Sequence, residues 1–449
     1  MTNEVPKKNQ DSPKKVGVIS LGCSKNRVDT ELMLGYLERA GYAITAKSDE
    51  AEVLIVNTCG FIEPAKQESI NSILEMARYK VEGRCRALVV TGCLSQRYRE
   101  ELPKELPEVD IWLGVREYEK LVPLLAALFG ESVSTDSVTL YPWGERRLTT
   151  PSYRALLRVA DGCDNRCAYC AIPLIRGRYQ SRDMESIVAE AKALVARGAV
   201  ELEIIAQDTT RFGTDTDRKR LLPELLRRLS ETDVKWIRIL YAYPDEMDEE
   251  LLAAIDELPK VLRYLDIPLQ HADDNVLKAM NRRGTSEQYA RLIDGLRQRD
   301  PSYILRTTYM VGFPGETEEA FENLCAFVQE HPFDRMGAFA FSPEEGTAAA
   351  EMPNQVPEEV KQRRLNRLMA IQREVSNSLA KRRIGTEVDV LVEGYDEKAK
   401  RYFGRSYGEA ADIDGLVFFA SNGQKKPGTF AKVRIDRVSD YDLYGEEIP

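Results

Sequence analysis

The sequence predicts a chain of three parts: an N-terminal doubly wound α/β domain, a central open (βα)6 partial barrel and a small C-terminal five-stranded barrel of OB-like type. Two observations support this fold class. Apolar, strand-like runs alternate with helical runs from Val16 to Arg383, which is typical of parallel sheets flanked by helices. From Ile384 onward, short alternating runs with Gly-rich turns replace that pattern, as expected of a small β-barrel.

The first fifteen residues carry four lysines together with Pro, Asn, Gln and Ser, and no apolar block follows them. We interpret residues 1–15 as a disordered, solvated tail and not as a signal peptide. Eight cysteines without an export signal indicate a reducing, cytoplasmic location and metal ligation. The formal net charge of −10 argues mildly against nucleic acid as the main partner, and no membrane segment is expected.

Residues 16–131 are expected to form the first domain from four β-then-α units. The expected strands are short apolar runs, at Val16–Leu21, Glu52–Val56, Ala87–Val90 and Val109–Leu113. The longer expected helices cover Glu31–Ala40, Ala65–Tyr79 and Tyr118–Phe129, and a short helix follows the third strand. Strands that alternate with helices at this pitch indicate a parallel, doubly wound sheet.

Three cysteines of this domain, Cys23, Cys59 and Cys93 (the N-terminal triplet), each come just after a strand. Ligands of open α/β sheets bind at the carboxyl ends of the strands, so these residues, spread over 70 positions, are expected to converge. We interpret them as ligands of a metal centre, and the alternative is that they are small core residues. Cys85 lies before its strand at the opposite edge and is excluded, while Cys325 is expected to be helix packing.

A stretch rich in Ser, Thr and Pro, residues 132–151, is expected to link this domain to a second one over residues 152–383. The expected strands of the second domain are Tyr153–Val159, Leu202–Ala206, Trp236–Tyr241, Tyr264–Ile267, Ile304–Val311 and Met336–Phe341. Its expected helices include Asp183–Ala196, Leu221–Leu229, Asp248–Leu258, Ser286–Arg297, Glu318–Gln329 and, leading out of it, Val356–Arg383. Six βα units are too few for a closed eight-stranded barrel, so an open barrel is expected.

Residues 384–449 are expected to form the small barrel, with strands at Glu387–Val392, Arg401–Ser406, Leu416–Ala420 and Thr429–Val438. This segment holds 9 Lys and Arg against 13 Asp and Glu, a net charge of −4, which is the wrong sign for RNA. Its acidic residues, among them Glu409, Asp412 and Asp414, are predicted to dock a basic protein partner. The alternative is that they only solvate a surface loop.

A second group of cysteines, Cys163, Cys167 and Cys170 (the central triplet), has the spacing C-x3-C-x2-C just after the first strand of the central domain. Disulfide pairing would leave one cysteine over, and structural zinc requires a fourth ligand that is missing nearby. A 4Fe–4S cluster on three thiolates explains the odd number, because its fourth iron is then free to bind something else. A zinc knuckle that takes a remote fourth ligand is the alternative.

This spacing is typical of the radical S-adenosylmethionine enzymes, and from about Val16 to the C-terminus the chain resembles their methylthiotransferase branch. The strings that carry the resemblance are SLGCSKNRVDTELMLG, VNTCGFIEPAKQESI, GCDNRCAYCAIPLIRGRYQSR, IAQDTTRFG and DIPLQHADDNVLKAMNRRGT. Members have a cluster-binding domain, a radical domain and a C-terminal barrel of the TRAM type. Ser24–Asn26 and His271–Asp273 stand where tRNA-modifying relatives typically carry Gln-Met-Asn and Ser-Gly-Ser, which favours the members that modify ribosomal protein S12.

The resemblance implies an enzyme that converts a C–H bond to C–S–CH3 on the β-carbon of an aspartate of S12. Its cofactors would be two 4Fe–4S clusters and S-adenosylmethionine, and it would need an electron donor. The central triplet would hold the cluster that binds and cleaves S-adenosylmethionine, and the N-terminal triplet the cluster that carries the sulfur to be inserted. A tRNA adenosine methylthiotransferase and a non-catalytic iron–sulfur sensor are the alternatives.

Further cofactor contacts follow from the resemblance. Gly312 and Gly315, in the string VGFPGET, resemble the segment that lines the adenine of S-adenosylmethionine, with a simple βα turn as the alternative. Gln207 and Asp208 end the second strand of the central domain, so their side chains are expected at its mouth. A cofactor contact and a structural role are both open for them.

Three residues of the string after the central triplet, Arg176, Ser181 and Arg182, are further candidates. Arg176 is expected to reach a carboxylate, with a solvated surface role as the alternative. His271 is one of two histidines and ends a strand, but it is not expected to act as a catalytic base. No Ser–His–Asp set or carboxylate pair stands out, which agrees with radical chemistry.

Overall fold

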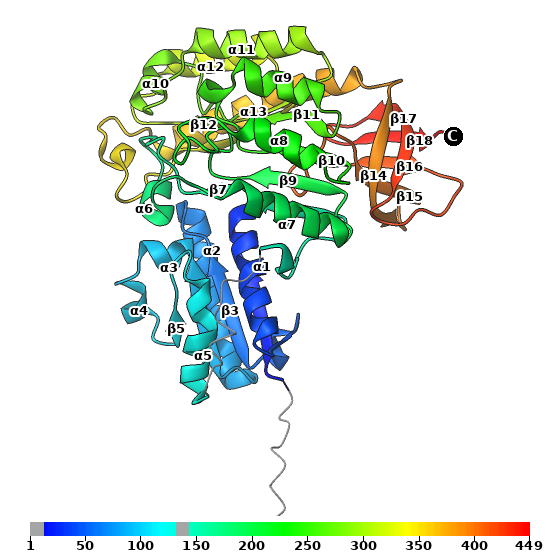
Figure 1. The fold of residues 1–449 in the computed structure, drawn as a ribbon. Coiled ribbons are helices and arrows are strands. Elements are labelled where there is room, and N and C mark those ends of the chain that lie inside the picture. Colours follow the sequence, from blue (N-terminus) through cyan, green and yellow to red (C-terminus); the bar gives the residue numbers. More distant parts are fainter. Residues whose placement is uncertain (1–12, 132–142) are drawn as a thin grey trace, which may run out of the picture. The chain divides into compact units, whose positions relative to one another are not determined.

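The computed structural model describes residues 13–131 and 143–449 (Figure 1). The expected tail at residues 1–15 and the expected linker at residues 132–151 lie largely outside the described residues. The chain divides into two compact units, Met1–Thr149 and Thr150–Pro449. None of the described helices is both long enough and apolar enough to cross a membrane.

The first unit is a parallel five-stranded sheet with helices on both faces (Figure 1). Its strands, in spatial order, are β2 (Ala43–Ile44), β1 (Lys15–Ser20), β3 (Val53–Thr58), β4 (Ala87–Gly92) and β5 (Ile111–Trp112). Its helices are α1 (Ser24–Arg39), α2 (Glu63–Glu82), α3 (Cys93–Arg97), α4 (Leu102–Glu105) and α5 (Leu121–Phe129). The doubly wound fold expected from the sequence is therefore confirmed.

Alternate residues of the central strands enter two separate hydrophobic clusters. Val53 and Ile55 of β3 pack in the cluster that includes residues of α1 and α5, whereas Leu54 and Val56 pack in the cluster that includes residues of α2. All six residues of β3 and all six of β4 are buried. Strands covered on both faces read as continuous apolar runs, which is why they were readily placed from the sequence.

Helix α1 begins earlier than expected. The sequence placed this helix at Glu31–Ala40, but it starts at Ser24, directly after Cys23. Its first two turns hold buried polar residues, among them Asn26 and Asp29, so they show no apolar periodicity. Strand β2 was missed because it has only two residues.

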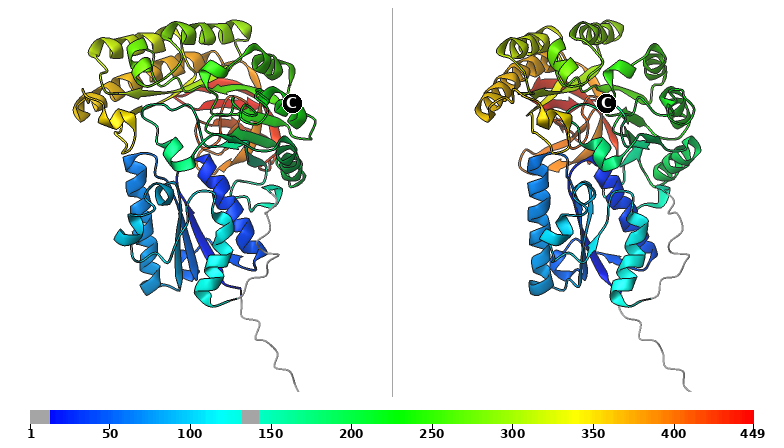
Figure 2. Two further views of the ribbon diagram at one scale, coloured as in Figure 1. Left: turned by 60° about the vertical axis from the view of Figure 1, so that its left-hand side comes forward. Right: turned by 90° about the vertical axis from the view of Figure 1, so that its left-hand side faces the viewer.

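The second unit contains a parallel six-stranded sheet with two edges, which confirms the open (βα)6 barrel. In spatial order its strands are β6 (Arg154–Arg158), β9 (Glu201–Ile205), β10 (Trp236–Ile239), β11 (Val261–Asp266), β12 (Ile304–Val311) and β13 (Arg335–Ala340). Figure 2 shows the helices around the outside of this sheet, and they are α7 (Met184–Ala196), α8 (Leu222–Ser230), α9 (Glu249–Glu257), α11 (Ser286–Arg299), α12 (Glu318–Glu330) and α13 (Glu358–Lys381). Two short helices, α6 (Ile172–Arg176) and α10 (Asp274–Ala279), and a small hairpin of β7 (Ala160–Asp161) and β8 (Gln180–Ser181) lie in the loops.

Local sequence fixes where several of these helices begin. The Asp183 side chain accepts a hydrogen bond from the Ser186 N–H at the start of α7. Thr285 forms a capping box with Gln288 at the start of α11, and Thr317 caps α12. Such caps satisfy backbone N–H groups that have no partner within the helix, so they place the helix starts close to the expected positions.

The C-terminal part of the second unit is a closed barrel with strand order β14-β15-β16-β18-β17, as expected. These strands are β14 (Glu387–Asp396), β15 (Arg401–Arg405), β16 (Val417–Ala420), β17 (Phe430–Val438) and β18 (Leu443–Glu447). Val390, Val417, Phe419, Val433 and Ile435 fill its interior. Strand β18, which closes the barrel, was not placed from the sequence.

Buried ion pairs join this barrel to the (βα)6 sheet within the second unit. Glu201, at the amino end of β9, accepts hydrogen bonds from Arg405 at 2.6 Å and from Arg238 at 2.9 Å. Both Glu201 and Arg238 are fully buried. Burial alone would raise the pKa of the Glu201 carboxyl, but the two arginines hold it below its ordinary value.

The prediction that the acidic residues of the barrel form a docking surface is wrong for Glu409, which is buried, and stays untested for Asp414 and for the exposed Asp412. Glu409 is fully buried and contacts Arg383 and Arg335. The Asp414 carboxylate accepts a hydrogen bond from the Tyr264 hydroxyl at 2.7 Å, and that of Asp412 accepts one from Arg154 at 2.8 Å. These acids hold the barrel against the rest of its unit, which a count of charges in the sequence cannot reveal.

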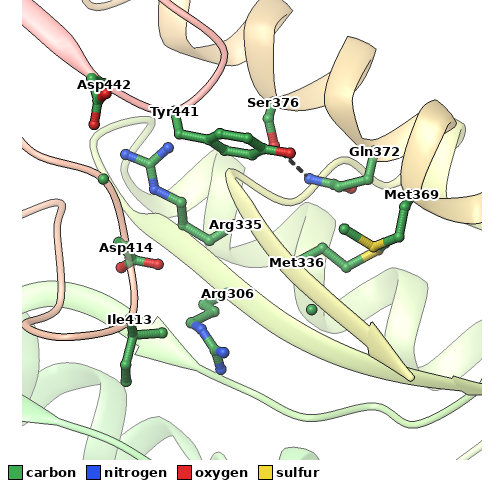
Figure 3. A pocket seen from close by; sticks show the side chains of 12 residues that line it. Arg306, Arg335, Met336, Met369, Gln372, Ser376, Ile413, Asp414, Tyr441 and Asp442 are labelled. Carbon is green, nitrogen blue, oxygen red and sulfur yellow. Dashed lines mark hydrogen bonds between the residues drawn. The ribbon is translucent and has the colours of Figure 1, made fainter. Parts of the chain in front are cut away.

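A cavity of about 480 Å³ lies beside these contacts (Figure 3). Arg306 and Arg335 come from β12 and β13, Gln372 and Ser376 from α13, and Tyr441 from a loop of the barrel. Arg306 is bound to Asp266 at 2.6 Å and Arg335 to Glu409 at 3.1 Å. The cationic side chains of the cavity are therefore already neutralised by carboxylates of the protein.

Candidate metal centres

The N-terminal triplet lies at one edge of the first sheet. Cys59 and Cys93 directly follow β3 and β4, and Cys23 follows β1 and is the N-cap residue of α1. Strands β1, β3 and β4 are neighbours in the sheet. Their carboxyl ends therefore bring the three cysteines to the same edge, as the sequence predicted.

Two glycines show how closely the three loops approach one another. A Cβ atom on Gly22 would stand 2.9 Å from the Cβ of Cys59 and 3.1 Å from its sulfur. A Cβ atom on Gly60 would stand 2.7 Å from the backbone of Leu94 and 3.0 Å from the carbonyl carbon of Cys93. No side chain fits at either position, and the loops of the triplet pack directly on each other.

Asn26, in the first turn of α1, ties these loops together. Its Nδ2 donates to the carbonyl oxygens of Leu21 at 3.0 Å and Thr58 at 2.8 Å. Its Oδ1 lies 3.4 Å from the sulfur of Cys93. Asn26 was not among the residues predicted from the sequence, although its place three residues after Cys23 was a usable indication.

The central triplet lies in the loop between β7 and α6. Cys163 N–H donates to the Gly177 carbonyl at 3.2 Å, and Cys170 N–H donates to that of Cys167 at 3.0 Å. Gly162 has φ +74°, and a Cβ there would stand 2.1 Å from the Arg178 carbonyl oxygen, so the loop requires glycine.

The donor chemistry of the central triplet fits a metal cluster. Burial raises the pKa of the Cys163 thiol to about 11 and raises that of Cys170 further above its ordinary value. Three thiols in one loop are the donor set of an iron–sulfur cluster, and a metal that binds them must take up the charge of the thiolates. Across residues 13–131 and 143–449, no group of three or more His, Cys, Asp or Glu side chains is arranged to hold a single metal ion.

The other two cysteines lie away from both triplets. Cys85 is buried in the cluster of α2 and the sheet of the first unit. Cys325 is buried on α12. Both positions agree with the packing roles expected for residues outside the metal centres.

Gln207 and Asp208, which were expected at the barrel mouth, differ in their hydrogen bonds. Gln207 donates from Nε2 to Asp161 at 3.1 Å, while its Oε1 is buried without a hydrogen-bond partner. Asp208 is 1% exposed, and its carboxylate accepts hydrogen bonds from Thr210 and Asn165. The Oε1 atom of Gln207 thus has no hydrogen-bond donor within the described part of the protein, whereas the Asp208 carboxylate binds Asn165 in the loop of the central triplet.

Gly312 and Gly315 differ in how closely other residues approach them. Both have positive φ, of +72° and +82°. A Cβ on Gly312 would stand 2.2 Å from the Lys361 side chain, so α13 makes the close approach at this position. Nothing lies within 4 Å of a Cβ on Gly315. Contact of either glycine with a cofactor stays a prediction.

The remaining candidates make contacts within the protein. Arg176 reaches the carboxylate of Asp161 at 3.2 Å, and Arg182 reaches Glu190 at 2.6 Å. The Ser181 hydroxyl donates to Asp215 at 2.6 Å. None of these residues is a solvated surface side chain without protein contacts.

His271 is fully buried, and a hydrogen bond holds its ring at Nδ1. Its Nδ1 accepts a hydrogen bond from the Asp273 N–H at 3.0 Å, and its Nε2 lies 3.2 Å from the Glu316 carboxylate. That His271 is not a catalytic base stays a prediction.

An open parallel (βα)6 barrel with a C-x3-C-x2-C loop at its carboxyl edge defines a radical S-adenosylmethionine protein. Residues 157–328 match the Radical SAM superfamily, residues 15–114 match the uncharacterized protein family UPF0004, and residues 384–448 match the TRAM domain. Among solved structures, the fold is similar to that of TsrM from Kitasatospora setae, with a TM-score of 0.55. TsrM is a radical S-adenosylmethionine methyltransferase, and its structure was solved with cobalamin and a [4Fe-4S] cluster bound. That likeness has 15% identity and covers 76% of this chain and 77% of TsrM.

Curated relatives are similar over nearly the whole chain. The ribosomal protein uS12 methylthiotransferase RimO of Symbiobacterium thermophilum is 49% identical, over 97% of this chain and 91% of its own length. The protein of the same name from Pelotomaculum thermopropionicum is 50% identical, over 97% of this chain and 99% of its own. The chain belongs to the family of ribosomal protein uS12 methylthiotransferases.

Proposed function

We propose that this chain is a radical S-adenosylmethionine methylthiotransferase that replaces a C–H bond by C–S–CH3 on the β-carbon of an aspartate of ribosomal protein uS12. The observation that carries the proposal is the similarity to the uS12 methylthiotransferases over 97% of the chain, at about half identity. The convergence of the N-terminal triplet at one sheet edge supports a second metal centre in addition to that of the central triplet.

The two triplets fit two 4Fe–4S clusters. Cys163, Cys167 and Cys170 would hold one cluster together with S-adenosylmethionine, and Cys23, Cys59 and Cys93 would hold the other. When bound, these groups supply the electron, the radical, the sulfur and the methyl group, which no side chain of the protein provides.

The protein contributes position and the exclusion of water. Asp161, at the end of β7, accepts hydrogen bonds from the Gly162 N–H, from Arg176 and from Gln207, and so fixes the start of the loop of the central triplet. Within that loop, Tyr169 packs edge-on against Phe313, with ring centroids 6.5 Å apart. These contacts give the loop one orientation and an apolar backing.

The substrate and the physiological setting form part of the proposal. The partner is uS12, either free or on the small ribosomal subunit, and the reaction takes place in the cytoplasm with an electron donor. The proposal needs no acid–base side chain at the reacting carbon, because the C–H bond of a β-carbon is not acidic enough for one.

The test is to incubate the anaerobically reconstituted chain with S-adenosylmethionine, dithionite and either uS12 or tRNA. We expect uS12 to gain the mass of one SCH3 group in place of one hydrogen, and 5′-deoxyadenosine to be released. A mass gain on tRNA alone would identify a tRNA methylthiotransferase instead. Absence of 5′-deoxyadenosine from cluster-loaded protein would indicate a non-catalytic iron–sulfur protein.

A further inference from the structure

Asn165 connects the central triplet to the neighbouring strand end. It lies between Cys163 and Cys167 and is 8% exposed. Its backbone N–H hydrogen-bonds to the sulfur of Cys163. Its side chain donates from Nδ2 to Asp208 at 2.8 Å and accepts on Oδ1 from Arg211 at 3.1 Å.

Asp208 is itself held rigidly. Its second carboxylate oxygen accepts a hydrogen bond from the Thr210 hydroxyl at 2.6 Å, and its backbone carbonyl accepts one from the Tyr179 hydroxyl at 3.0 Å. Asp208 follows β9, so its hydrogen bond with Asn165 fixes the loop of the central triplet relative to that strand. With both carboxylate oxygens engaged and 1% exposure, Asp208 is poorly placed to contact a cofactor.

We propose that Asp208 and Asn165 are positioning residues for the central cluster, acting through the orientation of the loop that carries Cys163 and Cys167. This rests on the proposed function only in that the loop holds a cluster. The contact has a direction: the amide must donate to Asp208 and accept from Arg211. A carboxylate only accepts and a guanidinium only donates, so one amide orientation satisfies both partners.

This direction suggests an exchange experiment. In Asp208→Asn, the new amide can still accept from Thr210, but its NH2 group then faces the NH2 group of Asn165. Asn165 can turn its amide only by losing its hydrogen bond from Arg211. Turning the new amide instead would make the Thr210 hydroxyl, which already accepts from the Tyr243 N–H at 3.2 Å, accept a second bond and lose its own acceptor. The double variant Asn165→Asp with Asp208→Asn restores a donor on one side and an acceptor on the other, and it keeps the contact with Arg211.

The chain offers a matched control in the same unit. One carboxylate oxygen of Asp273 accepts a hydrogen bond from the Asn323 side chain at 3.0 Å. The other oxygen accepts hydrogen bonds from the backbone N–H groups of Asn275 and Val276. Asp273→Asn therefore brings two amides together at the start of α10, whose other end meets the loop of the central triplet through Met280 and Ala168. Its effect on melting temperature shows the cost of an Asp-to-Asn change at a comparable contact outside the loop itself.

Three measurements test the proposal on the full, reconstituted chain: the rate of iron loss to a chelator, the EPR signal of the reduced protein with and without S-adenosylmethionine, and the rate of 5′-deoxyadenosine formation. None of them requires uS12, so failure here is distinguishable from failure of the proposed substrate. In Asp208→Asn we expect an altered EPR signal, faster loss of about half of the iron and a loss of about 10- to 100-fold in 5′-deoxyadenosine formation. The double variant should recover most of each, and Asp273→Asn should retain iron and signal.

Two outcomes would overturn the positioning role. If Asp208→Asn raised the KM for S-adenosylmethionine, left iron retention unchanged and was not rescued by Asn165→Asp, Asp208 would be a cofactor contact. If Asp208→Asn and Asp273→Asn lowered the melting temperature alike and neither changed the EPR signal, the contact would be ordinary packing.

Discussion

Gly22 lies against Cys59 so closely that a Cβ at position 22 would stand 3.1 Å from the cysteine sulfur. A methyl group at position 22 would therefore occupy space that Cys59 of the N-terminal triplet now uses. Residue type at position 22 controls the approach of two loops, because Gly22 and Cys59 follow neighbouring strands.

Gly22→Ala should displace Cys59 and weaken the cluster on the N-terminal triplet. We expect loss of about half of the bound iron, because the central triplet is unaffected. Gly41→Ala is the matched control: its φ of +88° is similar to the +84° of Gly22, but nothing lies within 4 Å of its Cβ. Both changes cost about 1 kcal/mol or more in backbone strain, so equal iron loss in both would contradict a role for the contact.

Two independent clusters should be visible in the iron content. Anaerobically reconstituted chain is expected to bind about eight irons, as two four-iron clusters require. Changing Cys163, Cys167 and Cys170 together to Ala should leave about half. Retention of all the iron, or loss of all of it, in that triple variant would show that the two triplets are not separate sites.

The two triplets should also separate in activity. The double variant Cys59→Ala with Cys93→Ala keeps the central triplet intact, so it should still release 5′-deoxyadenosine from S-adenosylmethionine. It should not methylthiolate uS12, because the proposed sulfur-carrying cluster is lost. Chromatography for 5′-deoxyadenosine and mass spectrometry of uS12 measure the two outcomes, and full methylthiolation would refute the assignment.

Glu409 should make the stability of the second unit depend on pH in the acid range. Burial would raise the pKa of the Glu409 carboxyl, but Arg383, Arg335 and the Ser406 hydroxyl lower it from 4.5 to about 2. A carboxyl with a lowered pKa stabilises the fold above its unfolded-state pKa, and it loses that contribution as the pH falls toward the folded-state value. Glu409→Gln should therefore destabilise the unit by about 3 kcal/mol near pH 7.

The measurement is the difference in unfolding free energy between the parent chain and Glu409→Gln, on apoprotein, at several pH values. This difference should shrink as the pH falls from about 4.5 toward 2. Glu397→Gln, at an exposed position in the loop between β14 and β15, is the control and should cause little change. A difference that is the same at pH 7 and pH 3 would rule out the charge of Glu409 as its source.

Strands and cysteine sites were most predictable where the pattern lay within a single strand or a short run of residues. The apolar runs of β3 and β4 and the close spacing of the central triplet are local patterns, and the structure has the corresponding elements. The convergence of the N-terminal triplet needed one further step, the rule that parallel strands share an edge. The elements that were missed, β2 and β18, are short strands whose pairing depends on distant partners.

Polar contacts between distant segments could not be predicted. The hydrogen bond of Asn165 with Asp208 joins residues 43 positions apart, and it depends on the adjacency of β6 and β9. Glu409 was misread for the same reason, since it meets Arg335 across 74 positions. A charge in the sequence has a sign, but its burial and its partner come only from the fold.

The buried ion pair between Glu201 and Arg405 also constrains how the chain matures. The two residues are 204 positions apart, and Arg405 lies in the last tenth of the sequence. During synthesis, Glu201 on β9 can pair with Arg238 of the neighbouring strand, but it lacks its second partner until residue 405 has been made. The buried carboxylate of β9 therefore gains its full set of ion pairs only after the strand that carries Arg405 has been made.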